Sequence, residues 1–151
     1  MRVIATQDGV LSNLEVRELL QARVKLRQST ERRRSLTGAR RGASPASWRH
    51  MQDAVVITDQ VMRYLDERPC AKQTRANIRA FTDAVAPFQL TRAEVLSLVN
   101  TQPRSLVEIH LIVEECDERL SVEQTQELLD LCAGLSATDP PAVRAKDAAK
   151  R

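Results

Sequence analysis

Apolar residues recur at spacings of three and four along most of this chain, which is the period of an amphipathic α-helix. The clearest case lies within residues 106–120, where one helical stripe holds five apolar side chains: Leu106, Ile109, Val113, Cys116 and Leu120. A similar stripe starts at Trp48 and continues to Leu65. Stripes of this kind turn toward a shared core, so both segments are predicted to be helices packed against other helices.

Four capping boxes indicate where helices begin. In this motif a Ser or Thr precedes a Glu or Gln by three residues, and each side chain accepts a hydrogen bond from the other residue's backbone N–H. The pairs are Ser12 with Glu15, Thr91 with Glu94, Ser105 with Glu108, and Ser121 with Gln124. Two further helices are expected to start near Ser47 and Thr74 and to end at prolines. Since strand signals are almost absent, the sequence predicts an all-α protein.

The one segment that reads as a strand is residues 2–6, Arg-Val-Ile-Ala-Thr. So short a strand cannot form a sheet without partners, and the chain offers no second one. The segment is therefore either a frayed terminus or an edge strand added to the sheet of a partner protein.

The domain organisation follows from these elements. We expect residues 1–10 to be an extended segment, residues 11–134 to form one helical domain, and residues 135–151 to be a disordered tail, because they have no apolar face. Within the domain, the first helix is expected to run from Asn13 to about Arg27 or beyond.

The helical period is lost in residues 32–47, which hold two glycines, a proline and five arginines. Glycine and proline at this density are typical of a loop. We therefore expect a basic mobile loop at 32–47.

The predicted helix at 106–120 carries a second apolar face. Val107 and Leu111 lie one turn apart and opposite the main stripe. One interpretation is a central helix flanked by two other helices of its own chain; the alternative is a surface for a partner. Four acidic residues follow this second face: Glu114, Glu115, Asp117 and Glu118.

Length and charge indicate how many cores the chain can form and where its charged surfaces lie. The 151 residues suffice for one core of mainly aliphatic side chains, since only four aromatic residues occur. Nine Lys or Arg residues stand against Glu31 alone between Arg23 and Arg49, whereas eight acidic residues stand against Arg119 alone between Glu108 and Asp130. The chain thus has a basic arm and an acidic end.

The basic arm has two interpretations, a solvated segment or a surface that attracts nucleic acid. Aromatic side chains for base stacking are missing from it before Trp48, which weakens the second interpretation. The candidate nucleic-acid contacts are Arg32, Arg33, Arg34, Arg40 and Arg41.

No pattern of catalytic or metal-binding residues stands out. His110 and Glu114 are spaced as two metal ligands could be, but such a pair more often forms a solvated hydrogen bond. The three cysteines, at 70, 116 and 132, have no CxxC spacing and are expected to be reduced core residues. We therefore expect a non-enzyme without a cofactor or metal, and, without a membrane span or signal peptide, a soluble intracellular protein.

Two blocks of sequence resemble a known family. The segment LSNLEV at 11–16 and the segment VEIHLIVEECDERLSVEQ at 107–124 are similar to the small stalk subunit of RNA polymerase III, the calcitonin-gene-related-peptide receptor component protein family. Shorter matches lie at 64–70 and 90–94, and residues 32–60 are unmatched. The chain departs from the family at Leu14, where an aromatic residue usually stands.

The resemblance implies a five- to six-helix bundle similar to the helicase-and-RNase-D C-terminal domain, with a short N-terminal β-strand that pairs with a partner. It implies a nuclear, non-catalytic subunit that forms an obligate heterodimer with the larger stalk subunit, binds the polymerase III core and supports initiation on tRNA and 5S rRNA genes. Nucleic-acid contact would be indirect or weak, and no membrane would be bound.

On this basis, six residues are candidates for partner binding: Val3, Ile4, Leu11, Leu14, Val107 and Leu111. The acidic residues Glu114, Glu115, Asp117 and Glu118 are candidates for an initiation-factor surface. Two alternatives remain open, a stand-alone nucleic-acid-binding helical domain and a cytoplasmic signalling adaptor of the receptor-component type.

Overall fold

A computed structural model describes residues 9–37 and 45–136 of the chain, with side chains at 9–33 and 52–136. The chain divides into two compact units, Met1–Arg68 and Pro69–Arg151. Over the described residues the protein contains seven α-helices and two short 3-10 helices and no strand, which confirms the all-α prediction. The predicted strand at 2–6 and residues 137–151 of the predicted tail lie outside the described residues, whereas Leu135, which was assigned to that tail, is buried in the core.

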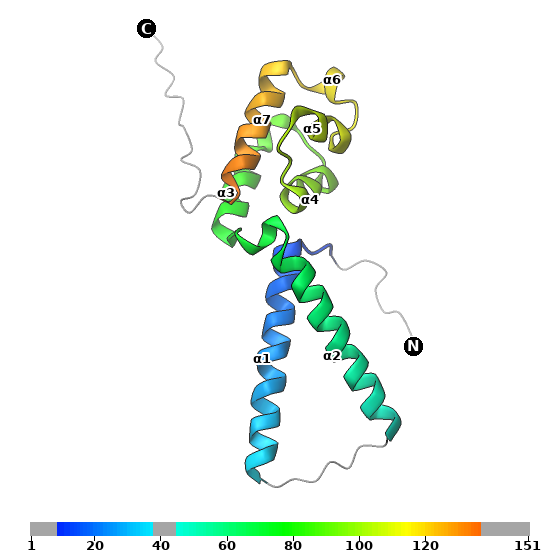
Figure 1. Cartoon of the computed structure of the whole chain (residues 1–151). Coiled ribbons are helices and arrows are strands. Elements are labelled where there is room, and N and C mark those ends of the chain that lie inside the picture. The colour runs from blue at the N-terminus through cyan, green and yellow to red at the C-terminus, as the bar shows by residue number, and fades with distance from the viewer. Residues whose placement is uncertain (1–8, 38–44, 137–151) are drawn as a thin grey trace. The chain divides into compact units, whose positions relative to one another are not determined.

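The first unit is a helical hairpin of α1 (Asn13–Thr37) and α2 (Pro45–Asp66). Figure 1 shows the two helices running in opposite directions and meeting where α1 begins and α2 ends. An ion pair joins them there, with Arg17 Nη2 at 2.8 Å from Asp66 Oδ1. The predicted capping box starts α1, since Ser12 N–H donates to the Glu15 carboxylate at 2.8 Å and Glu15 N–H donates to Ser12 Oγ at 3.3 Å.

The hairpin corrects the prediction of a loop at 32–47. Helix α1 continues to Thr37 and α2 already begins at Pro45, so residues 32–37 and 45–47 of the predicted loop are helical, and residues 38–44 lie outside the described residues. Arginine is a good helix former, and residues 32–37 contain no glycine or proline to stop the helix. Pro45 occupies the first helical position, where its missing N–H costs no hydrogen bond.

The second unit contains the remaining helices. They are η1 (Pro69–Ala71), α3 (Arg75–Ala84), η2 (Ala86–Phe88), α4 (Arg92–Thr101), α5 (Leu106–Ile112), α6 (Cys116–Arg119) and α7 (Val122–Gly134). Helix α7 packs against α3 and α5, and α4 packs against α5 (Figure 1). Their buried side chains form one core: Phe81, Val85, Phe88, Leu98, Val99, Ile109, Val113, Cys116, Leu120, Leu128, Cys132 and Leu135. All three cysteines are buried, as predicted.

The capping boxes of α4 and α7 are confirmed with both of their hydrogen bonds, at Thr91 and Ser121 respectively. The box at α5 forms only in part. Ser105 Oγ accepts from Glu108 N–H, but the Glu108 carboxylate accepts from Arg104 N–H at 2.6 Å instead of from Ser105.

The prediction of one continuous helix over 106–120 is wrong. Helix α5 ends at Ile112, Val113 is extended, and Glu115 takes a left-handed conformation with φ 50° before α6 begins. The apolar stripe still points inward, since Ile109, Val113, Cys116 and Leu120 are all buried. The same residues therefore lie in the core although the helix is interrupted. A polar cluster beside the break binds the backbone groups that the interruption leaves unpaired.

Candidate protein-interaction surfaces

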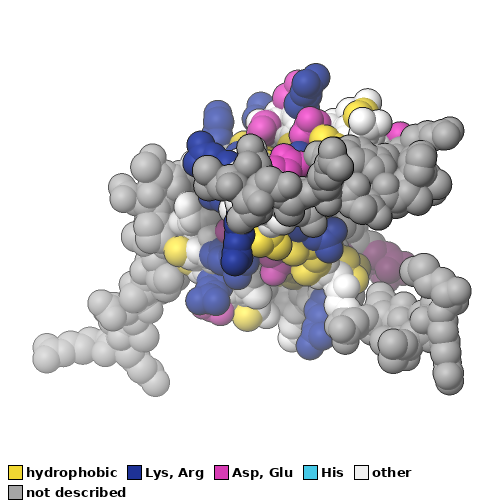
Figure 2. Space-filling model, turned by 90° about the horizontal axis from the view of Figure 1, so that it is seen from below, with side chains coloured by type: hydrophobic (Ala, Val, Ile, Leu, Met, Phe, Trp, Pro, Cys, Tyr) yellow, Lys and Arg dark blue, Asp and Glu magenta, His cyan; other side chains and the backbone are white. Residues whose placement is uncertain are grey.

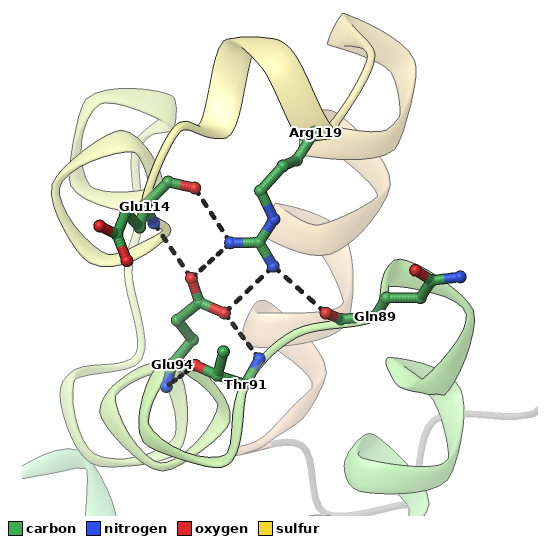
Figure 3. Close-up of polar contacts among 5 residues, drawn as sticks. All are labelled: Gln89, Thr91, Glu94, Glu114 and Arg119. Carbon is green, nitrogen blue, oxygen red and sulfur yellow. Dashed lines mark hydrogen bonds and ion pairs between the residues drawn. The ribbon is translucent and has the colours of Figure 1, made fainter.

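Glu94, in the first turn of α4, is a buried carboxylate at the centre of a polar cluster (Figure 3). It exposes 6% of its surface. Its carboxylate accepts from Thr91 N–H at 2.7 Å, from Glu114 N–H at 3.0 Å, and from Arg119 Nη1 at 2.7 Å and Nη2 at 3.3 Å. In a continuous helix the Glu114 N–H would bind the carbonyl four residues earlier, so Glu94 replaces a helical partner at the break.

Arg119, at the end of α6, completes the cluster. Its Nη1 also donates to the backbone oxygen of Glu114 at 3.0 Å, and its Nη2 donates to the backbone oxygen of Gln89 at 3.2 Å. The guanidinium thus connects α6 to the α5–α6 turn and to the segment before α4 (Figure 3).

This cluster is structural. The Arg119 guanidinium, aided by the N–H groups of Thr91 and Glu114, lowers the pKa of Glu94 from its ordinary 4.5 to about 2, although burial opposes the shift. The Glu94 carboxylate in turn raises the pKa of Arg119. Both groups stay charged at neutral pH and bind each other, so neither is suited to transfer a proton to a substrate.

The second apolar face of the sequence lies on α5 and is open. Val107 exposes 69% of its surface and Leu111 exposes 81%. The interpretation in which two other helices flank this face is therefore wrong for the helices of its own unit.

The acidic candidates Glu114, Glu115, Asp117 and Glu118 are all exposed. Figure 3 shows the Glu114 carboxylate pointing away from Glu94 and Arg119, although the Glu114 backbone belongs to the cluster. His110 Nδ1 lies 3.5 Å from Asp117 Oδ1, so the histidine pairs with α6 rather than with Glu114, because the break redirects the chain. No group of three His, Cys, Asp or Glu side chains suited to a metal occurs in the described segments.

The other candidates differ in exposure, and several of them lie outside the described residues. Leu11 is exposed and Leu14 is buried, while Val3 and Ile4 lie outside the described residues. Arg32 and Arg33 are exposed on α1, Arg34 belongs to α1, and Arg40 and Arg41 lie outside the described residues.

Residues 10–136 match the RNA polymerase Rpb4 family. The chain belongs to this family. The match confirms the resemblance seen at 11–16 and 107–124, and it also spans residues 32–60, where the sequence alone gave no match.

The Rpb4-family chain is similar to three curated proteins, each named as a DNA-directed RNA polymerase III subunit, rpc9. The protein of Schizosaccharomyces pombe is 27% identical over 134 residues, which are 86% of this chain and 95% of that protein. The protein of Dictyostelium discoideum is 27% identical over 85 residues, 50% of this chain and 65% of that protein. The protein of Saccharomyces cerevisiae is 40% identical over 47 residues, 31% of this chain and 29% of that protein. In the last two, the match covers less than two thirds of the relative's length.

The hairpin of the Rpb4-family chain has exposed apolar side chains that sequence reasoning missed. Leu19 and Leu26 of α1 expose 44% and 68% of their surfaces, and Val56 and Ile57 of α2 expose 54% and 59%. Figure 2 shows hydrophobic side chains reaching the surface on one face of the molecule, with Lys and Arg side chains among them. The sequence did contain a signal for these exposed positions. Val56 and Ile57 are apolar but lie beside the predicted stripe that runs from Trp48 to Leu65, not on it. No helix in the described segments is both long enough and apolar enough to cross a membrane.

Proposed function

We propose that this Rpb4-family chain is a non-catalytic, nuclear subunit of RNA polymerase III. In this proposal it forms a heterodimer with the larger stalk subunit and supports initiation on tRNA and 5S rRNA genes. The three relatives support the polymerase assignment by their names. The heterodimer has a separate, structural argument.

The observation that carries the heterodimer is the poor core in the described part of the α1–α2 hairpin. In the described part of this unit, Leu14 and Leu65 are the only buried hydrophobic side chains. Two helices gain most of their stability from packing an apolar face, and small units that bury little apolar surface usually need a partner. We infer that a partner protein covers the hairpin.

The side chains for that partner are the exposed apolar residues Leu19, Leu26, Val56 and Ile57. Full burial of such a side chain contributes roughly 1.5–3 kcal/mol. Because these are already partly covered, each is expected to add about 1 kcal/mol to association. Residues 1–10, with Val3 and Ile4, are proposed to add a strand to a sheet of the same partner.

The test is co-purification with the larger stalk subunit, measured by size-exclusion chromatography with light scattering. A Leu26→Glu, Ile57→Glu double variant is expected to lose the heterodimer, because burying two unpaired carboxylates opposes binding. The control is Gln28→Glu with Gln60→Glu, which adds the same charge at exposed polar positions of the same helices. Equal binding by both double variants would overturn the hairpin interface, and deletion of residues 1–6 tests the strand separately.

The polymerase assignment is tested by affinity purification of the tagged chain from nuclear extract. RNA polymerase III core subunits should be recovered with the wild-type chain. Recovery of a different nuclear polymerase, or of none, would contradict the proposal.

One observation favours a second candidate function, a nucleic-acid-binding helical domain. Arg23, Lys25 and Arg32 are exposed along α1, where Glu31 is the one acidic residue after Arg23. Contacts between such residues and phosphates make affinity fall steeply with salt. Binding of labelled RNA or DNA that weakens with salt, and disappears when these residues become Gln, would support it; absence of binding at low salt would exclude it.

A further inference from the structure

The apolar face of α5 is not needed for the core of its own unit. Ile109 and Val113, on the inner side, are 0% and 2% exposed, whereas Val107 and Leu111, one turn apart on the outer side, are 69% and 81% exposed. Two large apolar side chains this open form a small apolar contact surface on a unit that has a buried core of its own.

Carboxylates lie near this apolar pair in the sequence. Between residues 106 and 119 the chain has five acidic residues, all exposed, and one basic residue, Arg119. The guanidinium of Arg119 is bound to Glu94 and to two backbone oxygens, so it is directed toward the cluster. His110, the residue before Leu111, contacts Asp117 of α6. The acidic helix α6 therefore lies beside α5 at this position.

The α5–α6 turn is held in place before any partner binds. The Glu94 carboxylate of α4 accepts a hydrogen bond from the Glu114 N–H, and Arg119 of α6 donates one to the Glu114 carbonyl oxygen (Figure 3). Both backbone polar groups of Glu114 are thereby held in place. A surface that is already ordered loses less conformational entropy on binding.

We infer that this α5–α6 face binds a basic amphipathic helix of another protein. Apolar side chains of that helix cover Val107 and Leu111, and its Lys or Arg side chains pair with the exposed carboxylates of residues 108–118. One-turn spacing of apolar side chains suits packing against a helix, and the negative charge repels the phosphates of nucleic acid. The assignment of the partner's helix to a transcription initiation factor rests on the proposed function. The apolar and acidic character of the α5–α6 face is independent of that function.

The probe is a fluorescent Leu/Lys amphipathic peptide of about 18 residues, or five helical turns, and binding to the full chain is measured by anisotropy. Two control peptides have Glu in place of Lys, or Ser in place of Leu. The wild-type chain should bind the Leu/Lys peptide, with weaker binding at high salt, and should bind neither control peptide.

Variants locate the site. The double variant Val107→Ser, Leu111→Ser should weaken binding about tenfold, as expected when two central apolar contacts are lost. Glu114→Gln with Glu118→Gln should weaken binding and reduce its dependence on salt. The matched control is Glu127→Gln with Asp130→Asn on α7, which removes the same charge from exposed positions and should change little.

Two outcomes would overturn the inference: no binding at millimolar peptide, or equal binding by the wild type and the Val107→Ser, Leu111→Ser variant. Circular dichroism should show that the variants are folded, because the substituted side chains are exposed. The Val107→Ser, Leu111→Ser variant should keep the heterodimer, and the Leu26→Glu, Ile57→Glu variant should keep peptide binding. Failure of this inference is thereby distinguishable from failure of the proposed function.

Discussion

Arg119 Nη1 lies 2.7 Å from Glu94 Oε1, and this ion pair joins the end of α6 to the first turn of α4 across 25 residues of sequence. It also compensates for the break between α5 and α6. The Glu94 carboxylate accepts the Glu114 N–H that helix α5 leaves unpaired, and the guanidinium donates to the Glu114 carbonyl oxygen. The capping box of one helix thereby fixes the end of another.

Replacement of Glu94 by Gln should destabilise the second unit by about 1–3 kcal/mol. An amide has one acceptor oxygen where the carboxylate has two, and its NH₂ group would face the N–H donors that the carboxylate now accepts. Urea unfolding followed by circular dichroism measures the change. Glu127→Gln, at an exposed position of α7, is the control and should have almost no effect.

The contribution of Glu94 should depend on pH. Its pKa is lowered from 4.5 to about 2 in the folded protein, so protons bind more readily to the unfolded state. The stabilisation is therefore present in full above about pH 5 and is lost as the pH falls through 4.5 toward 2. The difference in unfolding free energy between wild type and Glu94→Gln, measured from pH 7 to pH 3, should shrink on acidification; a constant difference would contradict this account.

A pair of Leu→Ala substitutions separates core from surface. Leu128 is 0% exposed and Leu111 is 81% exposed. Leu128→Ala should cost about 3 kcal/mol, because it removes buried methyl groups and leaves a cavity, whereas Leu111→Ala should change stability little. Thermal or urea unfolding of the isolated chain decides this, and a large loss for Leu111→Ala would mean that the α5 face is covered within the chain.

The thiols should be unreactive until the second unit unfolds. Burial raises the pKa of Cys132 to about 12, and Cys70 and Cys116 are buried as well. Because the thiolate is the reactive form, labelling with a thiol reagent at pH 8 should be slow for the native chain and fast in urea. Rapid labelling of the native chain at any of the three positions would show that the core opens locally.

The left-handed residue at the break provides a further test. Glu115 has φ 50°, a conformation that costs about 1–2 kcal/mol for residues with a Cβ and little for glycine. Glu115→Gly should therefore keep or raise the stability of the second unit, and Glu115→Val should lower it. Urea unfolding of the two variants provides the comparison; if the order is reversed, the turn is not held in this conformation in solution.

Much of the fold was accessible from local sequence. The capping residues Ser12, Thr91 and Ser121 start helices as predicted, because a capping box involves residues only three apart. The burial of Ile109, Val113, Cys116 and Leu120 was also predicted from their spacing. It held even though the helix breaks, because an inward-facing position depends on the core more than on one continuous helix.

The candidate surfaces were predicted less completely. The sequence indicated Val107 and Leu111 as a second apolar face but could not decide whether another helix covers it. The exposed residues of the hairpin, such as Leu26 and Ile57, were not identified because their exposure depends on how α1 and α2 pack.

The sequence by itself determined the helical class, most of the helix starts and the family, since these depend on residues close together or on a continuous motif. Tertiary structure alone decided the break after Ile112 and the pairing of Glu94 with Arg119. The physical reason is that a backbone N–H leaves its helix only when another acceptor compensates it, and here that acceptor is supplied by α4, 20 residues away from Glu114 in the sequence.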